Sequence, residues 1–150
     1  MRVVLQRVDW AAVKVDGVEI ARIGRGLLVL VGISRDDSPE DMEWTARKIA
    51  ELRIFDDSEG KLNLSLQDIG GELLLVSQFT LYGDCKKGRR PSYSDAAPPA
   101  EAEKMYQQFV EVARRWVPGV QSGRFQAMMD VSLTNSGPVT LILDSRKTFQ

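Results

Sequence analysis

The segment from Gly70 to Asp84, GGELLLVSQFTLYGD, joins an apolar run to a group of polar residues. The unbroken run Leu73–Val76 is typical of a strand that is covered on both faces. Ser77, Gln78 and Thr80 follow before the apolar character returns. Successive side chains of a strand point to opposite faces, so Ser77 and Thr80 share a side only if the strand ends or kinks near Gln78. We therefore expect a buried strand with an irregularity at Gln78.

Such an irregularity has a possible chemical use. A kinked strand end frees backbone N–H groups, and free N–H groups can form an oxyanion hole. The alternative is structural: the polar side chains hydrogen-bond one another or a neighbouring loop, as most buried polar groups do. The segment alone leaves both interpretations open.

Outward from this segment, the sequence predicts strands and two main helices. Asp16-Gly17 lies between two Val-containing runs and is a strong hairpin signal. Ser38 followed by Pro39 has the pattern of a helix N-terminus, and Pro98-Pro99 precedes a second helix over residues 100–116. Strands or short extended segments are expected at residues 2–15, 18–23, 27–33, 62–66, 72–82, 120–125, 127–134 and 139–143.

These elements indicate an α/β (α+β) fold, with a mainly antiparallel sheet or barrel flanked by two main helices. The length of 150 residues and the absence of repeats or linkers suit a single domain over residues 1–150. Hydrophobic content of 43% and charged content of 27% are typical of a soluble globular protein. No apolar run approaches the ~20 residues of a membrane helix. The N-terminus lacks a signal-peptide pattern, so we expect a cytoplasmic protein without membrane contact.

The absence of histidine narrows the possible chemistry. It excludes His-based triads, His general bases and His metal ligands. With Cys85 as the single cysteine, a disulfide within the chain is impossible and a transition-metal site is not expected. We therefore expect neither a metal nor an organic cofactor. The net charge is −1, so any contact with RNA must be local.

A second group of polar and turn-forming residues occupies Thr134–Thr140, TNSGPVT. Pro138 cannot donate to a sheet ladder, so it predicts a turn between two strands. An X-Pro peptide bond is the kind for which a cis form is accessible. Gly137 would let backbone carbonyls approach a ligand closely. A plain hairpin turn explains the same residues through local turn chemistry.

A cluster of cations, Lys86-Lys87-Gly88-Arg89-Arg90, lies in the polar segment that follows Tyr82. The cluster could contact phosphate groups, but a solvated loop is the commoner explanation of such a run. The neighbouring Cys85 has no histidine partner and is therefore a poor candidate for a nucleophile.

Two motifs together resemble the paired signatures of the D-aminoacyl-tRNA deacylases, formerly called D-tyrosyl-tRNA deacylases. They are Ser77-Gln78-Phe79-Thr80 and Asn135-Ser136-Gly137-Pro138-Val139-Thr140. The similarity covers nearly the whole chain and includes MRVVLQRV, IGRGLLVLVGI, LRIFDD with GKLNLS, KKGRRPSYSDAAPP and SGRF. Two motifs in the right order, with these flanks, make the resemblance specific.

The resemblance implies a cytoplasmic homodimer that hydrolyses the ester between a D-amino acid and the 3′-terminal adenosine of tRNA. It also implies removal of glycine from mischarged tRNA-Ala. In the family, the Gly-Pro of one subunit is cis and projects into the other subunit's pocket. Carried over, Gly137 and Pro138 would collide with an L side chain, which is specificity by rejection. Asn135 belongs to the same substrate-binding motif, and Arg7 matches a position that supports it.

The resemblance also assigns catalytic and adenosine-binding residues. The implied catalytic set is Ser77, Gln78, Phe79 and Thr80. Within it, the backbone N–H of Phe79 is the candidate oxyanion donor. The ribose 2′-OH of the tRNA would help to activate the attacking water, so that the protein side chains position rather than react. Phe125 and Met129 match positions near the adenosine pocket.

The chain departs from the family pattern at two places. It reads Phe125-Gln126-Ala127 where FGA is usual, and it has Ser136 where Asp is usual. Neither departure removes a residue that is assigned to the chemistry. Substrate breadth is the property on which both bear.

Two other functions are consistent with the sequence. One is a catalytically idle RNA-binding module whose loop cations, Lys86, Lys87, Arg89 and Arg90, contact phosphates. The other is a covalent hydrolase with Thr80 as the nucleophile, although no side-chain base is visible to activate it.

Overall fold

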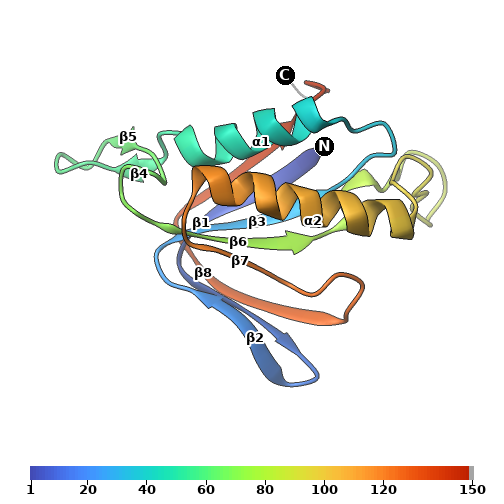
Figure 1. Cartoon of the computed structure of the whole chain (residues 1–150), viewed down its shortest axis with the longest axis horizontal. Coiled ribbons are helices and arrows are strands. Elements are labelled where there is room, and N and C mark those ends of the chain that lie inside the picture. The colour runs from blue at the N-terminus through green and yellow to red at the C-terminus, as the bar shows by residue number, and fades with distance from the viewer. Residues whose placement is uncertain (149–150) are drawn as a thin grey trace.

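The computed structural model describes residues 1–148 and has two helices on one side of a strongly curved sheet (Figure 1). Helices α1 (Pro39–Glu51) and α2 (Pro99–Trp116) lie side by side. A 3-10 helix, Phe79–Tyr82, follows β6. The strands are β1 (Arg2–Val15), β2 (Val18–Ile23), β3 (Gly26–Gly32), β4 (Phe55–Asp56), β5 (Leu62–Leu64), β6 (Glu72–Ser77), β7 (Val120–Ser122) and β8 (Met129–Asp144).

The six-stranded sheet is built around the long strand β1. One edge of β1 pairs with β8, while the other edge pairs first with β3 and then, from Ala11 onward, with β2. These pairs are antiparallel, whereas β3, β6 and β7 pair in parallel. The predicted class, a sheet or barrel flanked by two helices, is confirmed. The parallel pairs were not predicted, because strand direction depends on partners that are distant in sequence.

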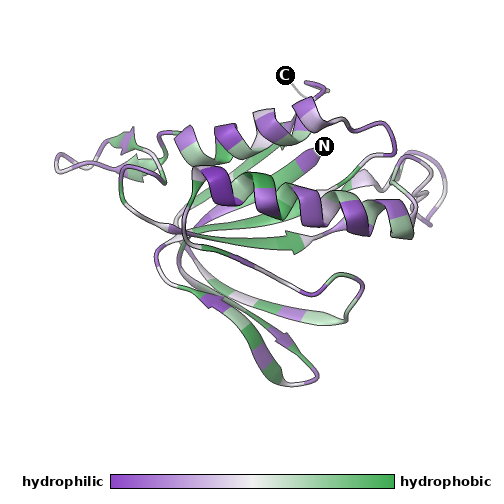
Figure 2. Cartoon of the chain, viewed as in Figure 1, coloured by the Kyte–Doolittle hydropathy of each residue, from purple (hydrophilic) through white to green (hydrophobic). Residues whose placement is uncertain are grey.

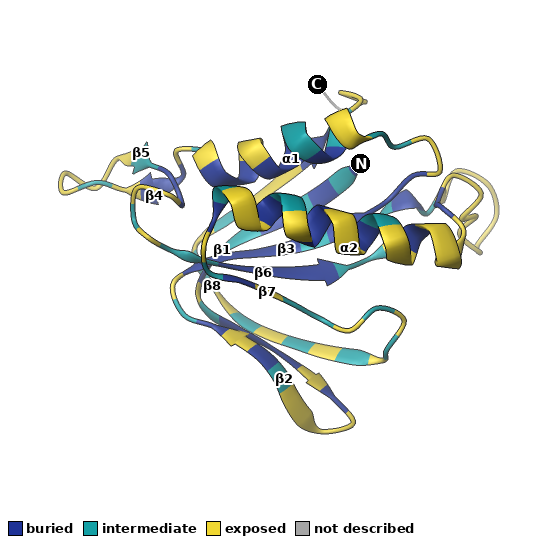
Figure 3. Ribbon diagram, in the orientation of Figure 1, coloured by how far each residue is buried: buried dark blue, intermediate teal, exposed yellow. Residues whose placement is uncertain are grey.

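Strands β3 and β6 are buried on both faces, which explains their unbroken apolar sequences (Figure 2, Figure 3). Leu73 and Leu75 belong to the core that lies between the sheet and the helices. Leu74 and Val76 belong to a second core. The second half of β1, β2 and the first half of β8 curl beneath the sheet and cover this second core. Strand β6 therefore has the two covered faces that its sequence predicts.

Helix α1 begins at the predicted residues. The Ser38 hydroxyl accepts a hydrogen bond from the Asp41 N–H, and the Asp41 carboxylate accepts one from the Ser38 N–H. This reciprocal pair is a capping box, and Pro39 opens the helix. Neither helix among the described residues is long and apolar enough to cross a membrane. The predicted domain covers residues 1–150, of which 149 and 150 lie outside the described residues.

The strand predicted over residues 72–82 is shorter than expected. Strand β6 ends at Ser77, and the Gln78 N–H donates to the Val31 carbonyl at 2.7 Å before the chain enters the 3-10 helix. The expected irregularity at Gln78 is therefore present. The strand predicted over residues 120–125 is also short, since β7 ends at Ser122.

The turn predicted at Pro138 was wrong. Residues 129–144 form one strand, β8, because β1 is long enough to pair with both of its halves. Val8 pairs with Asn135 and Gln6 pairs with Thr140, so the residues between them bulge out of the ladder. A bulge adds residues to one strand without reversing its direction.

Candidate active site

The candidate site forms where the parallel strands β6 and β7 part. Strand β7 pairs only with Leu73–Leu75, and the Gly123 N–H donates to the Leu75 carbonyl at 2.9 Å. Beyond that bond the chain leaves β6 and reaches β8 through residues 124–128. The edge of β6 at Val76–Gln78 is therefore uncovered, and a cavity of about 780 Å³ lies against it.

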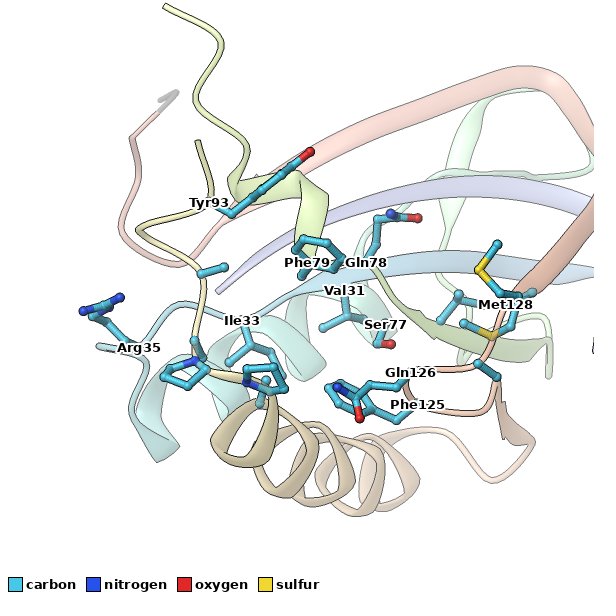
Figure 4. A pocket seen from close by; sticks show the side chains of 18 of the residues that line it. Val31, Ile33, Arg35, Ser77, Gln78, Phe79, Tyr93, Phe125, Gln126 and Met128 are labelled. Carbon is cyan, nitrogen blue, oxygen red and sulfur yellow. The ribbon is translucent and has the colours of Figure 1, made fainter. Parts of the chain in front are cut away.

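The walls of the cavity come from four other parts of the chain (Figure 4). Ile33 follows β3, Pro98 and Pro99 begin α2, and Tyr93 comes from the long loop before α2. Residues 125–129 form the remaining wall. Most of these side chains are apolar, as is typical of a small-molecule pocket with a few polar groups.

Three of the four predicted catalytic residues line the cavity, and the fourth does not. Ser77, Gln78 and Phe79 lie along the wall, whereas Thr80 is exposed and is not part of the lining. The Ser77 hydroxyl has no hydrogen-bond partner among the described residues and lies on the cavity side in Figure 4. The Gln78 side-chain amide donates to Thr80 Oγ1 at 2.5 Å. Thr80 is thus placed to orient Gln78 rather than to attack a ligand.

Phe79 contributes both its ring and its backbone at the mouth of the cavity. The residue is 57% exposed, and its ring meets the Tyr93 ring edge-on, with centroids 5.0 Å apart. Its backbone N–H has no acceptor among the described residues, since it lies between the last sheet bond of Gln78 and the 3-10 helix. A free N–H at this point can donate to an oxygen atom of a ligand.

The predicted adenosine-binding residues Phe125 and Met129 also line the cavity. The Phe125 ring packs against Tyr106 of α2 at a centroid distance of 6.0 Å. Between them, Gln126 has a φ of 61°, in the left-handed region that glycine adopts most easily. The departure from the family's usual glycine therefore falls on a strained backbone position of the cavity wall.

The second motif lies outside the cavity of its own chain. The Gly137–Pro138 peptide is cis, and both residues are exposed. Arg7 supports this bulge: its Nε donates to the Ser136 carbonyl at 3.1 Å, and its Nη1 donates to the Ile54 carbonyl at 3.0 Å. The Asn135 amide closes the bulge, since it donates to Thr140 Oγ1 at 3.0 Å and accepts from the Val139 N–H at 3.3 Å. None of these residues lines the cavity.

The cavity offers few ionisable groups. Among the described residues that line it, only Arg35 and Tyr93 have ionisable side chains. Behind the wall, burial raises the pKa of Tyr106, whose hydroxyl donates to the Leu75 carbonyl at 2.9 Å. Within residues 1–148, no group of three or more Asp, Glu or Cys side chains is placed to hold a metal ion. No carboxylate or imidazole side chain lies among the described residues that line the cavity, so none is available there as a general base.

Several lining residues were missed by the sequence predictions. Arg35, Tyr93 and Pro98 reach the cavity from loops that lie outside both motifs. Tyr93 and Pro98 lie within the segment KKGRRPSYSDAAPP, which the resemblance already singled out. Arg35 carries no local signal, because it is a single exposed cation after a buried strand.

Comparison with known proteins gives a consistent family match. The family model described as D-Tyr-tRNA(Tyr) deacylase matches residues 4–144. A D-aminoacyl-tRNA deacylase of Thermosipho africanus is 58% identical over 149 residues, which are 99% of this chain and 100% of that protein. A D-aminoacyl-tRNA deacylase of Desulfitobacterium hafniense is 56% identical over the same shares of the two chains.

Solved structures share the fold. A protein described as c-Myc DNA Unwinding Element Binding Protein is 42% identical, with a TM-score of 0.92 over 96% of this chain and 98% of that chain. A probable eukaryotic D-amino acid tRNA deacylase is 22% identical, with a TM-score of 0.80 over 95% of this chain and 97% of that chain. The second likeness bears on the fold alone.

Proposed function

The chain belongs to the D-Tyr-tRNA(Tyr) deacylase family, and on that premise we propose that it hydrolyses the ester between a D-amino acid and the 3′-terminal adenosine of tRNA. The products are the free D-amino acid and the tRNA. One observation supports this function most directly. The apolar cavity ends at Ser77–Phe79, inside the first signature motif, and no base lines it. We place the reaction in the cytoplasm, where aminoacyl-tRNAs are used.

The cavity suits the aminoacyl-adenosine end of tRNA. Its volume of about 780 Å³ lies within the ~300–1,000 Å³ that is usual for small-molecule sites. Phe125 and Met129 supply apolar surface for the adenine ring, and base–aromatic stacking contributes ~1–3 kcal/mol per base. Ser77 and Gln78 supply the polar groups that orient the ester.

Water activation in this proposal uses the substrate. Because no lining side chain is a base, the ribose 2′-OH next to the ester helps to activate the attacking water. The Phe79 N–H donates to the oxyanion that develops on the ester carbonyl. The protein therefore contributes orientation and electrostatic stabilisation rather than a covalent step.

Chiral selection in this proposal comes from a second copy of the chain. Gly137 and Pro138 are exposed on a bulge that Arg7 and Asn135 brace, and they do not line their own chain's cavity. In a homodimer they would enter the cavity of the partner and face the α-carbon of the substrate. An L side chain would collide with them, whereas a D side chain or the hydrogen of glycine would not. Glycyl-tRNA-Ala is therefore a second expected substrate.

Exposed apolar side chains support the dimer. Phe79, Tyr93 and Met128 are exposed around the cavity, and Leu141 and Ile142 are exposed on β8 just after Pro138. Large exposed apolar side chains that gather at two regions of a surface are typical of places that another protein covers. These two regions are the ones that a cross-subunit site would bring together.

The experiment that tests the function compares three esters. Purified protein is incubated with D-tyrosyl-tRNA, L-tyrosyl-tRNA and glycyl-tRNA-Ala in the presence of EDTA, and the loss of each ester is followed. We expect the D-tyrosyl and glycyl esters to be hydrolysed while the L ester survives. Hydrolysis of all three would contradict selection by rejection.

The alternative of an idle RNA-binding module predicts a different result. All three esters would survive, while tRNA binding would be retained and would weaken steeply as salt is added. That outcome would mean that the chain has kept the family's fold without its activity.

A further inference from the structure

The cationic loop, residues 84–95, is a structured loop beside the cavity. Its two ends are joined by a pair of backbone hydrogen bonds: the Asp84 N–H donates to the Ser92 carbonyl at 2.7 Å, and the Ser92 N–H donates to the Asp84 carbonyl at 2.9 Å. The Lys86 N–H donates to the Asp84 carboxylate at 2.9 Å, and Gly88 turns the chain with a φ of 68°. The loop therefore presents its tip in a defined direction.

The tip of the loop carries four cations without ion-pair partners among the described residues. Lys86, Lys87, Arg89 and Arg90 are all exposed. No ion pair or side-chain hydrogen bond engages any of them within residues 1–148, whereas four other exposed arginines of the described residues form ion pairs. The loop's own acids, Asp84 and Asp95, lie at its two ends. The tip is thus a local positive region on a chain whose net charge is −1.

The loop is connected directly to the mouth of the cavity. Tyr93 follows the joined end at Ser92, lines the cavity and packs against Phe79. Arg35, which also lines the cavity, donates from Nη2 to the Ser94 carbonyl at 2.6 Å. Figure 4 places Arg35 at one edge of the cavity and Tyr93 beside Phe79. In Figure 1 the loop lies at the end of the molecule where α2 begins. Arg35 at the cavity rim is thus hydrogen-bonded to the loop, and the cations of the tip lie further along the same loop.

We propose that the cationic loop binds the phosphates of the RNA strand that leads to the terminal adenosine in the cavity. This inference rests on the proposed function, because the adenosine in the cavity sets where the strand must begin. Arg35 would meet the phosphate nearest to the adenosine, and the loop tip would meet those further along the strand. The occupant is a nucleic-acid strand because four free cations in one loop match a chain of regularly spaced phosphates.

The test uses two substrates that differ only in their phosphates. D-Tyrosyl-adenosine carries the ester and the nucleoside without any phosphate, whereas a D-tyrosyl minihelix carries the acceptor stem and its 3′ end. Arg89→Ala/Arg90→Ala is compared with Lys14→Ala/Arg47→Ala. The control removes the same charge from two exposed cations, on β1 and α1, that form no ion pair within residues 1–148.

The expected result is a loss that depends on phosphates. Arg89→Ala/Arg90→Ala should raise KM for the minihelix about tenfold and leave kcat nearly unchanged. The slope of log(kcat/KM) against log[KCl] should become shallower by about 1.4, because each single-strand phosphate contact contributes ~0.7. Activity on D-tyrosyl-adenosine should stay at the wild-type level, which also shows that the variant is folded. The control pair should match the wild type on both substrates.

Two outcomes would overturn the inference. One is an equal loss on both substrates, since the loop would then act through the cavity. The other is a minihelix KM and salt slope that equal those of the control pair. If the wild type hydrolyses neither ester, the proposed function fails. The binding of a minihelix that carries no amino acid, measured by fluorescence anisotropy, then decides the inference by itself. Weaker binding of the loop variant than of the control supports it, and equal binding refutes it.

Discussion

At the scale of single residues, Thr80 distinguishes positioning from covalent chemistry. Its hydroxyl accepts a hydrogen bond from the Gln78 side-chain amide, and Thr80 does not line the cavity. Thr80→Ala should therefore keep kcat for D-tyrosyl-tRNA within about tenfold of the wild type, because only the orientation of Gln78 is loosened. Single-turnover kinetics on the variant provide the measurement, with Ser77→Ala as the comparison inside the cavity. Complete loss of turnover in Thr80→Ala, together with an acyl-enzyme trapped on Thr80 of the wild type, would instead show that Thr80 is a nucleophile.

The backbone conformation of Gln126 leads to a second prediction at this scale. Its φ of 61° costs a non-glycine residue ~1–2 kcal/mol, part of which Gln126→Gly should recover. Glycine loses more conformational entropy on folding than glutamine does, and this loss offsets part of the relieved strain. We therefore expect a net gain of about 0.5–1 kcal/mol in the free energy of unfolding. Urea unfolding measures this gain. Arg124→Gly is the control, because φ of Arg124 is not positive and glycine there should lower stability.

At the scale of elements, the α1 capping box predicts a dependence on pH. Burial alone would raise the pKa of Asp41, but hydrogen bonds from Ser145 and Ser38 and the nearby N-terminal charge hold it below its ordinary value of 3.8. The folded state therefore binds this proton less tightly than the unfolded chain does. The stability that Asp41 contributes is fully present above pH 3.8 and is lost as the pH falls through the lowered pKa.

Asp41→Asn tests this dependence. The variant should lose about 0.5–1 kcal/mol of unfolding free energy at pH 7, and the difference from the wild type should shrink as the pH falls below 3.8. Denaturant unfolding at a series of pH values gives both quantities. Glu40→Gln is the matched control in the same turn, since Glu40 is exposed and makes no capping bond. A difference that stays constant down to pH 2 would show that the carboxylate charge is irrelevant to the cap.

The parallel pairing of β3 with β6 makes another prediction at this scale. A Cβ atom on Gly26 would lie 1.8 Å from the Glu72 carbonyl oxygen, which belongs to the backbone and cannot move aside cheaply. Gly26→Ala should therefore cost at least about 2 kcal/mol or prevent folding. Gly119→Ala is the control, because its Cβ would lie at an ordinary 3.4 Å from the Glu72 side chain. Equal melting temperatures for the two variants would mean that the strands separate readily at Gly26.

At the scale of the whole molecule, the proposed dimer can be tested by a substitution at Ile142. Its side chain is 52% exposed on β8, close in sequence to Pro138. Ile142→Lys should weaken dimerisation about tenfold or more, because it places a charge in an apolar contact. Sedimentation equilibrium measures the dimer, and activity at low protein concentration should fall in parallel. Val18→Lys, at a position that is 64% exposed on the β1–β2 hairpin, should change neither. A monomeric wild type that still spares L-tyrosyl-tRNA would rule out the cross-subunit site.

Much of this molecule follows from local sequence. The Asp16-Gly17 hairpin, the capped start of α1, the buried faces of β6 and the break at Gln78 all appear as predicted. Hydrophobic period, cap residues and turn chemistry act over a few neighbouring positions, so a single segment contains the information needed to predict each feature. The two signature motifs are likewise continuous segments, and the family could be predicted from them.

Tertiary structure alone settles how those segments meet. The parallel edge of β6 beside β7 opens the cavity, and Arg35, Tyr93 and Pro98 reach it from distant loops. The continuous pairing of β8 with β1 turns an expected hairpin at Pro138 into an exposed bulge that lies outside the cavity of its own chain. These outcomes depend on which strands compete for the same backbone partners across the whole chain. No local pattern of side chains records that competition, because backbone hydrogen-bonding groups are nearly identical at every residue.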